Sequence, residues 1–276
     1  MTRFFVNIPY PILQDRVDDI IARGLHPEIV LDASSLDQLD RREAQRLAEK
    51  LHKEGRDNTL HGPFRDLSPG GVDPKIQAVT RERLGQTMEL AGVFRPKCVI
   101  FHSGYDPWRF HSHERVWLQN SLETWTPPVK KAEEIDVTLA VENVFETTPV
   151  LLSALVDRIA SPHFRYCFDV GHHHVFGKQP IDDWIRTMGP HVAEIHLHDN
   201  MGTADDHLPI GSGTIDFPRV FRLLRQYLEV EPIFCLEPGR EEYLDTIIRA
   251  FMQLTREVAW PTAPDSEGMA PKKRPS

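Results

Sequence analysis

Short apolar runs rich in β-branched and aromatic residues recur along the chain and alternate with longer segments of helical periodicity. In residues 77–91, for example, Val79, Leu84, Met88 and Ala91 share one helical face. Strict alternation of strand and helix predicts a parallel sheet, and eight repeats predict a single (β/α)8 TIM barrel, which typically needs about 250 residues. The predicted strands are residues 3–8, 28–32, 57–61, 97–102, 137–142, 165–169, 192–196 and 233–237.

Capping residues and prolines mark the starts of the predicted helices. Asp216 is placed to cap a helix over residues 217–228, with Pro218 in its first turn, and Pro74 marks the start of an earlier helix. We therefore expect one barrel domain over residues 1–260. Residues 261–276 offer four prolines and one methionine as their only large apolar residue, so we expect a disordered C-terminal tail.

The formal net charge is −9, and because the tail carries three basic and two acidic side chains, the rest of the chain carries −10. Such an acidic body disfavours nucleic acid as a partner. The three cysteines form no CxxC pair and no basic and apolar leader precedes the first strand, which predicts a cytoplasmic protein. No apolar run approaches the roughly 20 residues of a membrane span.

Metal-binding side chains stand at the ends of six predicted strands, where the strands of a barrel open into its mouth. These six are His61, His102, Glu142, Asp169, His196 and Glu237. Three short clusters add candidates just beyond strands, namely Asp169-Val-Gly-His172, His196-Leu-His198-Asp199 and Asp205-Asp-His207. Carboxylate and imidazole donors without a thiolate suit a divalent ion such as zinc or manganese.

Strand alternation also predicts the barrel interior. Residues two and four positions before a strand-end ligand point the same way as that ligand, which turns Cys98, Cys167 and Cys235 inward as buried filler rather than reactive thiols. The same count turns Glu194 inward, and a bulge or an internal ion pair would accommodate this charged residue.

Two long loops follow strands on the mouth side, where they suit a lid and the walls of a substrate pocket or, equally well, a simple cover over the top of the barrel. Residues 62–73 are rich in glycine and proline, and residues 103–112 carry Tyr105, Trp108 and Phe110.

Several groups near the mouth are candidates for binding a substrate anion. Arg65, Arg109 and Arg240 could bind a phosphate or carboxylate, or only neighbouring acidic side chains. The backbone of the turn Gly211-Ser-Gly213 could cradle an anion or simply connect a loop to a helix.

These residues carry a family resemblance over residues 4–252: the chain resembles the xylose isomerase-like TIM-barrel superfamily, also called the AP endonuclease family 2 group. The matching stretches are LHGPF at His61, FHSG at His102, VENVF at Glu142, FDVGHHH at Asp169 and His172, EIHLHDN at His196, DDHLPIGSGTIDF at Asp205 and His207, and FCLEPG at Glu237.

In the sugar isomerase and ketose epimerase branch, the resemblance implies that Glu142, Asp169, His196 and Glu237 hold one divalent ion, commonly manganese. It further implies that Glu142 or Glu237 removes a carbon-bound proton to form an enediolate, while His172 orients a hydroxyl. Many barrels of this resemblance form dimers or tetramers, so the resemblance is compatible with a homo-oligomer, but the sequence does not determine the oligomeric state.

In the endonuclease IV branch, nine positions bind three zinc ions that hydrolyse a phosphodiester. This chain keeps all nine, His61, His102, Glu142, Asp169, His172, His196, Asp205, His207 and Glu237. The acidic body, the lack of DNA-penetrating loop insertions and the retention of DxHLPIGxGxIDF in small-molecule members favour a metal-dependent isomerase or epimerase of a small sugar or sugar phosphate. The alternatives are a tri-zinc hydrolase of a phosphodiester or amide and, ranked below it, a non-catalytic metal-binding barrel.

Overall fold

Eight parallel strands pair in chain order and close into a barrel when β1 pairs with β8. The structure is a computed structural model that describes residues 2–261. The strands are β1 (Phe5–Pro9), β2 (Pro27–Val30), β3 (Thr59–His61), β4 (Cys98–His102), β5 (Thr138–Glu142), β6 (Phe164–Asp169), β7 (Val192–Leu197) and β8 (Ile233–Leu236). The predicted (β/α)8 fold is confirmed, and the predicted strand ends differ from the observed ones by at most two residues.

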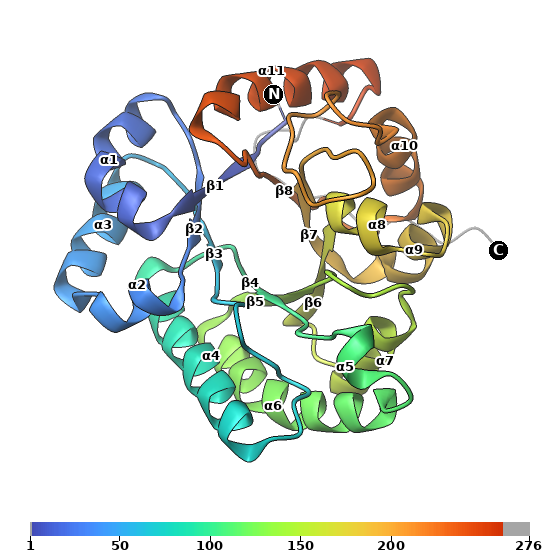
Figure 1. Cartoon of the computed structure of the whole chain (residues 1–276). Coiled ribbons are helices and arrows are strands. Elements are labelled where there is room, and N and C mark those ends of the chain that lie inside the picture. Colours follow the sequence, from blue (N-terminus) through green and yellow to red (C-terminus); the bar gives the residue numbers. More distant parts are fainter. Residues whose placement is uncertain (1, 262–276) are drawn as a thin grey trace.

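The helices surround the barrel as an outer ring (Figure 1). They are α1 (Tyr10–Ala22), α2 (Ala33–Gln38), α3 (Arg41–Lys53), α4 (Pro74–Phe94), α5 (Pro107–Phe110), α6 (Glu114–Ile135), α7 (Val150–Ile159), α8 (Val170–Phe176), α9 (Ile181–Met188), α10 (Phe217–Tyr227) and α11 (Leu244–Glu257), with 3-10 turns at Gly189–His191 and Glu241–Tyr243. Three short helices, α2, α5 and α8, are additional to the eightfold alternation, because each lies between a strand and the main helix of its repeat.

Aspartate caps fix several helix starts, since a side-chain oxygen satisfies free backbone N–H groups in the first turn. Asp216 accepts from the Arg219 N–H at the start of α10, and Asp73 accepts from the N–H groups that begin α4. The predicted roles of Asp216 and of the prolines beside these caps are confirmed.

The face predicted for α4 is partly wrong. Val79 is 48% exposed, whereas Leu84, Met88 and Ala91 are buried as expected. Thr80 takes the inward position instead, and its hydroxyl donates to Ile76 O and accepts from the backbone of the loop that precedes the helix. A threonine whose hydroxyl is fully hydrogen-bonded is therefore buried at this point of the helix, where the apolar pattern had predicted Val79.

Two apolar regions result from the alternation of side chains along the strands. The larger lies between the barrel and the helices, and a small one fills the barrel interior with Cys98, Ile100, Ala140 and Cys167. Cys235 is buried and free like the other two cysteines, and burial raises the pKa of all three thiols well above the usual range. The predicted structural role of the cysteines agrees with this placement.

Glu194 points into the barrel interior and is fully buried, as alternation predicts. The pairing of β6 with β7 skips Ala193, because Tyr166 faces Val192 while the next residue, Cys167, faces Glu194. The irregularity precedes Glu194, so Glu194 and His196 keep the same inward direction.

The predicted C-terminal tail falls almost entirely outside the described residues. Within residues 2–261, no helix combines the length and the apolar character required to cross a bilayer.

Candidate metal centre

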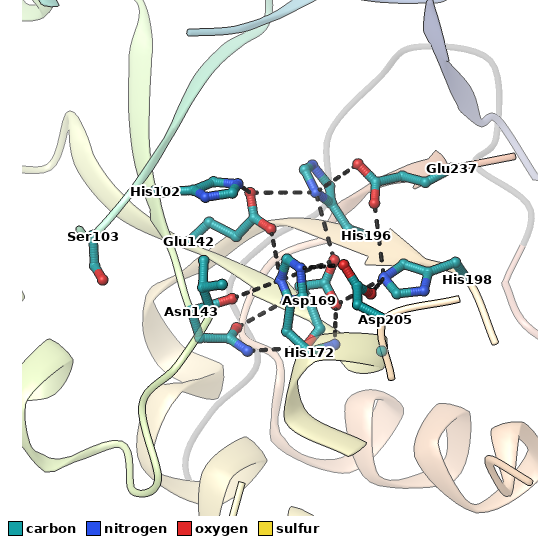
Figure 2. A network of polar contacts seen from close by, with 12 residues as sticks. His102, Ser103, Glu142, Asn143, Asp169, His172, His196, His198, Asp205 and Glu237 are labelled. Atoms are coloured by element: carbon teal, nitrogen blue, oxygen red, sulfur yellow. Dashed lines mark hydrogen bonds and ion pairs between the residues drawn. The ribbon is translucent and has the colours of Figure 1, made fainter. Parts of the chain in front are cut away.

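A cavity of about 540 Å³ opens at the carboxyl ends of the strands, the side of a barrel where active sites form. The structure brings the nine predicted residues together: seven line the cavity floor, and Asp169 and His196 are buried directly against them. Figure 2 labels all of the nine except His61 and His207. They come from the ends of β3, β4, β5, β6, β7 and β8, from the first turn of α8 and from the loop after β7.

The central group lies around the Nδ1 atom of His196. Glu237 Oε1 is 3.2 Å away, Glu142 Oε2 3.5 Å and Asp169 Oδ2 3.9 Å. All four side chains are almost completely buried. Three carboxylates and one imidazole facing each other form a donor set of the type that holds a divalent ion.

A second group shares the carboxylate of Glu142. The Nε2 atom of His61 lies 3.1 Å from Glu142 Oε2, and Nε2 of His102 lies 3.5 Å from the same oxygen. Because Glu142 also faces His196, this one carboxylate links the two groups.

A third group surrounds Asp205. Its Oδ2 atom lies 3.3 Å from Nε2 of His172 and 3.1 Å from Nε2 of His207. His207 has a φ of 47°, a left-handed conformation that is rare for residues other than glycine. Such local strain is typical of functional sites.

Local structure fixes Asp169 and His172 relative to each other. Asp169 ends β6 and caps α8, where its Oδ1 accepts from the backbone N–H of His172 at 2.6 Å. The His172 Nδ1 atom lies 3.1 Å from Glu142 Oε1 and 3.0 Å from the carbonyl of Asn143. In the motif DVGH, the hydrogen bond by which Asp169 caps α8 therefore fixes the position of His172 relative to Asp169.

His198 joins this floor although it lies outside the nine predicted ligands. It is fully buried, stacks on His207 with ring centroids 3.9 Å apart, and its Nε2 is 3.3 Å from Asp169 Oδ1. Gly171 provides the space, since a Cβ there would lie 2.0 Å from His198 Cε1. Its position in the cluster HLHD was the available sequence signal.

The histidines and carboxylates of the floor shift each other's pKa values. Burial alone would raise the pKa of Glu142, but His102 and His196 outweigh it and hold the pKa well below its usual range. Burial lowers the pKa of His102 to about 3, whereas contact with Asp205 overcomes burial and raises the pKa of His207 to about 9. The buried carboxylates therefore require positive charge from protonated histidines or from a cation.

A second observation, the presence of buried polar atoms without partners in the described part of the chain, also indicates that these residues suit a divalent ion. Among the described residues, Asp169 Oδ2 and both ring nitrogens of His196 and His198 are buried without an aligned hydrogen-bond partner. Buried polar atoms are rarely left unpaired, and metal ligation is one way to satisfy them. Their oxygen and nitrogen chemistry suits zinc or manganese equally.

The two mouth loops were predicted correctly as walls of the pocket, but not in every residue. Phe64 stacks on His102 at 4.3 Å between ring centroids, and Tyr105 also lines the cavity. Trp108 is instead 94% exposed and Phe110 is buried against Tyr105, so neither lines it.

Of the three arginines predicted as anion-binding candidates, two lie at the cavity and one does not. Arg65 and Arg109 line the cavity, and Arg109 pairs with Asp106. Arg240 lies outside the cavity lining and pairs with Glu242.

The turn around Gly211 and Gly213 already binds an anion from the protein itself. Both glycine N–H groups donate to Asp199 Oδ2 at 2.9 Å. The turn therefore fixes the loop after β7 and leaves these N–H groups unavailable to a substrate.

The sequence profile of the family described as xylose isomerase-like TIM barrel matches residues 26–257. The uncharacterized protein MJ1311 of Methanocaldococcus jannaschii is 30% identical over 175 residues, which are 60% of this chain and 59% of that protein. The chain thus spans about three fifths of the length of the curated relatives that it matches.

Two solved structures share the fold. A D-tagatose 3-epimerase-like protein has a TM-score of 0.81 at 22% identity, covering 93% of this chain and 98% of that one. A D-psicose 3-epimerase in the presence of D-fructose has a TM-score of 0.73 at 14% identity, covering 92% and 99%. At these identities the likeness concerns the fold.

Proposed function

Because this chain belongs to the xylose isomerase-like TIM barrel family, we propose that it is a divalent-metal-dependent isomerase or epimerase of a small sugar or sugar phosphate. The observation that carries the proposal is the pair of buried glutamates, Glu142 and Glu237, which lie on either side of His196 at the floor of the cavity (Figure 2). A D-psicose 3-epimerase and a D-tagatose 3-epimerase-like protein share the fold, and this likeness is in keeping with the proposed chemistry.

We assign the ion to the central group, Glu142, Asp169, His196 and Glu237. A bound divalent ion would supply charge that polarises a substrate carbonyl and its neighbouring hydroxyl. The cavity of about 540 Å³, walled by aromatic side chains, suits a small molecule.

The two glutamates move the proton. One carboxylate removes the hydrogen from the carbon next to the substrate carbonyl, and the C–H electron pair enters the carbon skeleton to give an enediolate. For epimerisation, the other glutamate starts the step protonated and donates its proton to the same carbon from the opposite face, and proton exchange of both carboxyl groups with water restores the starting state. His172, in contact with Glu142 and Asp205, is placed to orient a substrate hydroxyl.

A hydrolase that uses three zinc ions is the second candidate, and the two flanking groups are the observation that favours it. His61 and His102 meet Glu142, while His172, His198, Asp205 and His207 form another potential metal-binding group. Such a centre would cleave a phosphodiester or amide with water as the nucleophile.

The cytoplasmic location and a homo-oligomeric state remain predictions.

Solvent exchange separates the candidates. The metal-loaded protein, incubated in D2O with a panel of keto sugars and their phosphates, is expected to place deuterium on the carbon next to the carbonyl. No deuterium in any sugar, together with ¹⁸O from labelled water in a cleaved phosphodiester or amide, would replace the isomerase by the hydrolase.

A further inference from the structure

Glu28 is a fully buried carboxylate in register with Thr59, and so lies two residues deeper in the barrel than the floor residue His61. It belongs to β2, a strand that supplies none of the nine floor residues. Both of its oxygens accept hydrogen bonds: Asn7 Nδ2 donates to Oε1 at 3.0 Å, and Thr59 Oγ1 donates to Oε2 at 3.2 Å. The side chain is therefore held from two neighbouring strands, β1 and β3.

The same carboxylate faces the lower edge of His196. His196 Nε2 lies 3.3 Å from Glu28 Oε2, while His196 Nδ1, on the other edge of the ring, faces Glu237 and Glu142. A neutral imidazole offers a lone pair at Nδ1 only if its proton is on Nε2. The Glu28 carboxylate lies close enough to Nε2 to attract its proton, although the pair is not aligned as a hydrogen bond in this structure, and it therefore favours that tautomer and orients the ring, as in many carboxylate–histidine–metal arrangements.

Glu194 is the alternative acceptor, and its geometry is less suitable. Its nearest oxygen lies 4.0 Å from His196 Nε2, and neither of its oxygens has a hydrogen-bond partner among the described residues. Glu28, in contrast, is closer to His196 and anchored by Asn7 and Thr59.

Asn7 extends the influence of Glu28 to a second floor residue. The Asn7 amide that donates to Glu28 also donates to Glu237 Oε1 at 3.1 Å. We propose that Glu28 is a positioning residue that holds His196 with Nδ1 toward the cavity and, through Asn7, fixes the carboxylate of Glu237. This assignment rests on the proposed metal-dependent function.

Glu28→Gln tests the assignment because glutamine replaces one of two accepting oxygens with a donating NH2 group. Either Asn7 or the side that faces His196 and Thr59 must then lose its acceptor. Glu194→Gln is the comparison variant in the same buried layer. The oxygens of Glu194 receive no aligned hydrogen bond from the described residues, and burial beside Glu28 raises the pKa of Glu194 well above its usual range, so this substitution replaces a neutral acid.

The measurement is the affinity of the metal-stripped full chain for Mn²⁺ and Zn²⁺ by competition with a chromophoric chelator. Glu28→Gln should bind about 10- to 100-fold more weakly than wild type, the usual effect of losing an outer partner of a metal ligand. Glu194→Gln should stay within about threefold of wild type. Long-range ¹H–¹⁵N spectra of the zinc-loaded protein, in which the ion takes the place of the Nδ1 proton, should show the His196 proton on Nε2 in wild type and a loss of that preference in Glu28→Gln.

Unchanged affinity and unchanged tautomer in Glu28→Gln would overturn the inference, as would an equal loss in Glu194→Gln. If Glu28→Gln does not fold, Thr59→Val removes only one donor to Glu28 and should weaken binding by about threefold or more, so wild-type affinity there would also contradict it. Wild-type protein that binds neither ion would overturn the proposed function together with the inference. A wild type that binds metal and exchanges sugar protons confines any failure to Glu28.

Discussion

Nε2 of His61 lies 3.1 Å from Oε2 of Glu142, a contact between residues that are 81 positions apart in the chain. The same Glu142 oxygen is 3.5 Å from Nδ1 of His196. One carboxylate thus belongs both to the central group and to a flanking histidine pair. Whether the flanking histidines are needed distinguishes one-ion chemistry from three-ion chemistry.

Replacing His61 or His207 by alanine removes a flanking histidine but none of the four central residues. If the protein is a one-ion isomerase, each variant should keep one ion per chain. Its kcat/KM should fall at most about tenfold, the lower end of the loss caused by removing a residue that contacts a metal ligand. Metal content and steady-state rates measure this, with the exposed His52→Ala as control. Loss of ions and of nearly all activity would favour the hydrolase.

Glu142→Gln and Glu237→Gln should each lower kcat/KM by about 10²- to 10⁴-fold or more, because each removes a candidate proton acceptor as well as a ligand charge. Proton exchange between sugar and D2O should fall in parallel. Glu123→Gln, on the exposed side of α6, is the control and should behave as wild type. Exchange at the wild-type rate in either floor variant would contradict the assigned roles.

Metal removal should destabilise the protein, because an ion that binds only the folded state adds to its stability. At a free ion concentration of 100 times Kd the gain is about 2.7 kcal/mol, which corresponds to a rise in Tm of about 5 to 10 °C for a domain of this size. Thermal unfolding with chelator, with Mn²⁺ and with Zn²⁺ measures it. Identical melting curves in all three would argue against a metal centre.

Gly171→Ala should disrupt the floor, since the added Cβ would lie 2.0 Å from the His198 ring. We expect a loss of about 1 to 3 kcal/mol in the free energy of unfolding, as for other overpacked sites. Gly85→Ala is the matched control: it is also helical, and its Cβ would meet nothing within 4 Å. That control should gain up to about 1 kcal/mol from helix propensity. Urea unfolding distinguishes the two, and equal stability of both variants would refute the steric account.

Glu146 predicts a pH dependence of stability. It is buried, accepts hydrogen bonds from Ser103 and from the Val144 N–H, and burial raises its pKa from 4.5 to about 7. Between these values only the folded state keeps the proton, so the stability that Glu146 contributes is complete below pH 4.5 and is lost as pH rises through 7. Relative to Glu146→Gln, wild type should lose up to about 3 kcal/mol across this window. Urea unfolding of both proteins at pH 4.5 and 7.5 tests this, and a constant difference would contradict it.

The barrel and the meeting of the six strand-end residues were predictable because both follow from the alternation of strands and helices. His172, Asp205 and His207 lie beyond strand ends, and they were predicted from short clusters and from the family resemblance. A parallel strand that ends in a polar residue must present it at the mouth, so His102 and Glu142 were placed by position alone. Whether the nine bind metal stays a prediction.

The residues that the sequence did not identify depend on contacts between distant strands. Glu28 begins an apolar strand and has no motif of its own, and its role becomes visible only when Asn7, Thr59 and His196 surround it. His198 had a motif, but its burial depends on the space left by Gly171.

Loop residues were predicted least well, because their directions depend on local hydrogen bonds. Trp108 follows Asp106, which caps the short helix α5, and this helix turns the indole outward while Tyr105 faces the cavity. The turn at Gly211 and Gly213 has the expected anion-binding form, but Asp199 occupies it.

The most direct test of the proposed metal-dependent isomerase is the metal content per chain, measured by native mass spectrometry on protein purified without chelator from cells supplied with both zinc and manganese. The account predicts one divalent ion per chain, lost in Glu237→Gln and retained in His207→Ala. Three zinc ions per chain, with two or more lost in His207→Ala, would contradict it and assign the floor to hydrolysis.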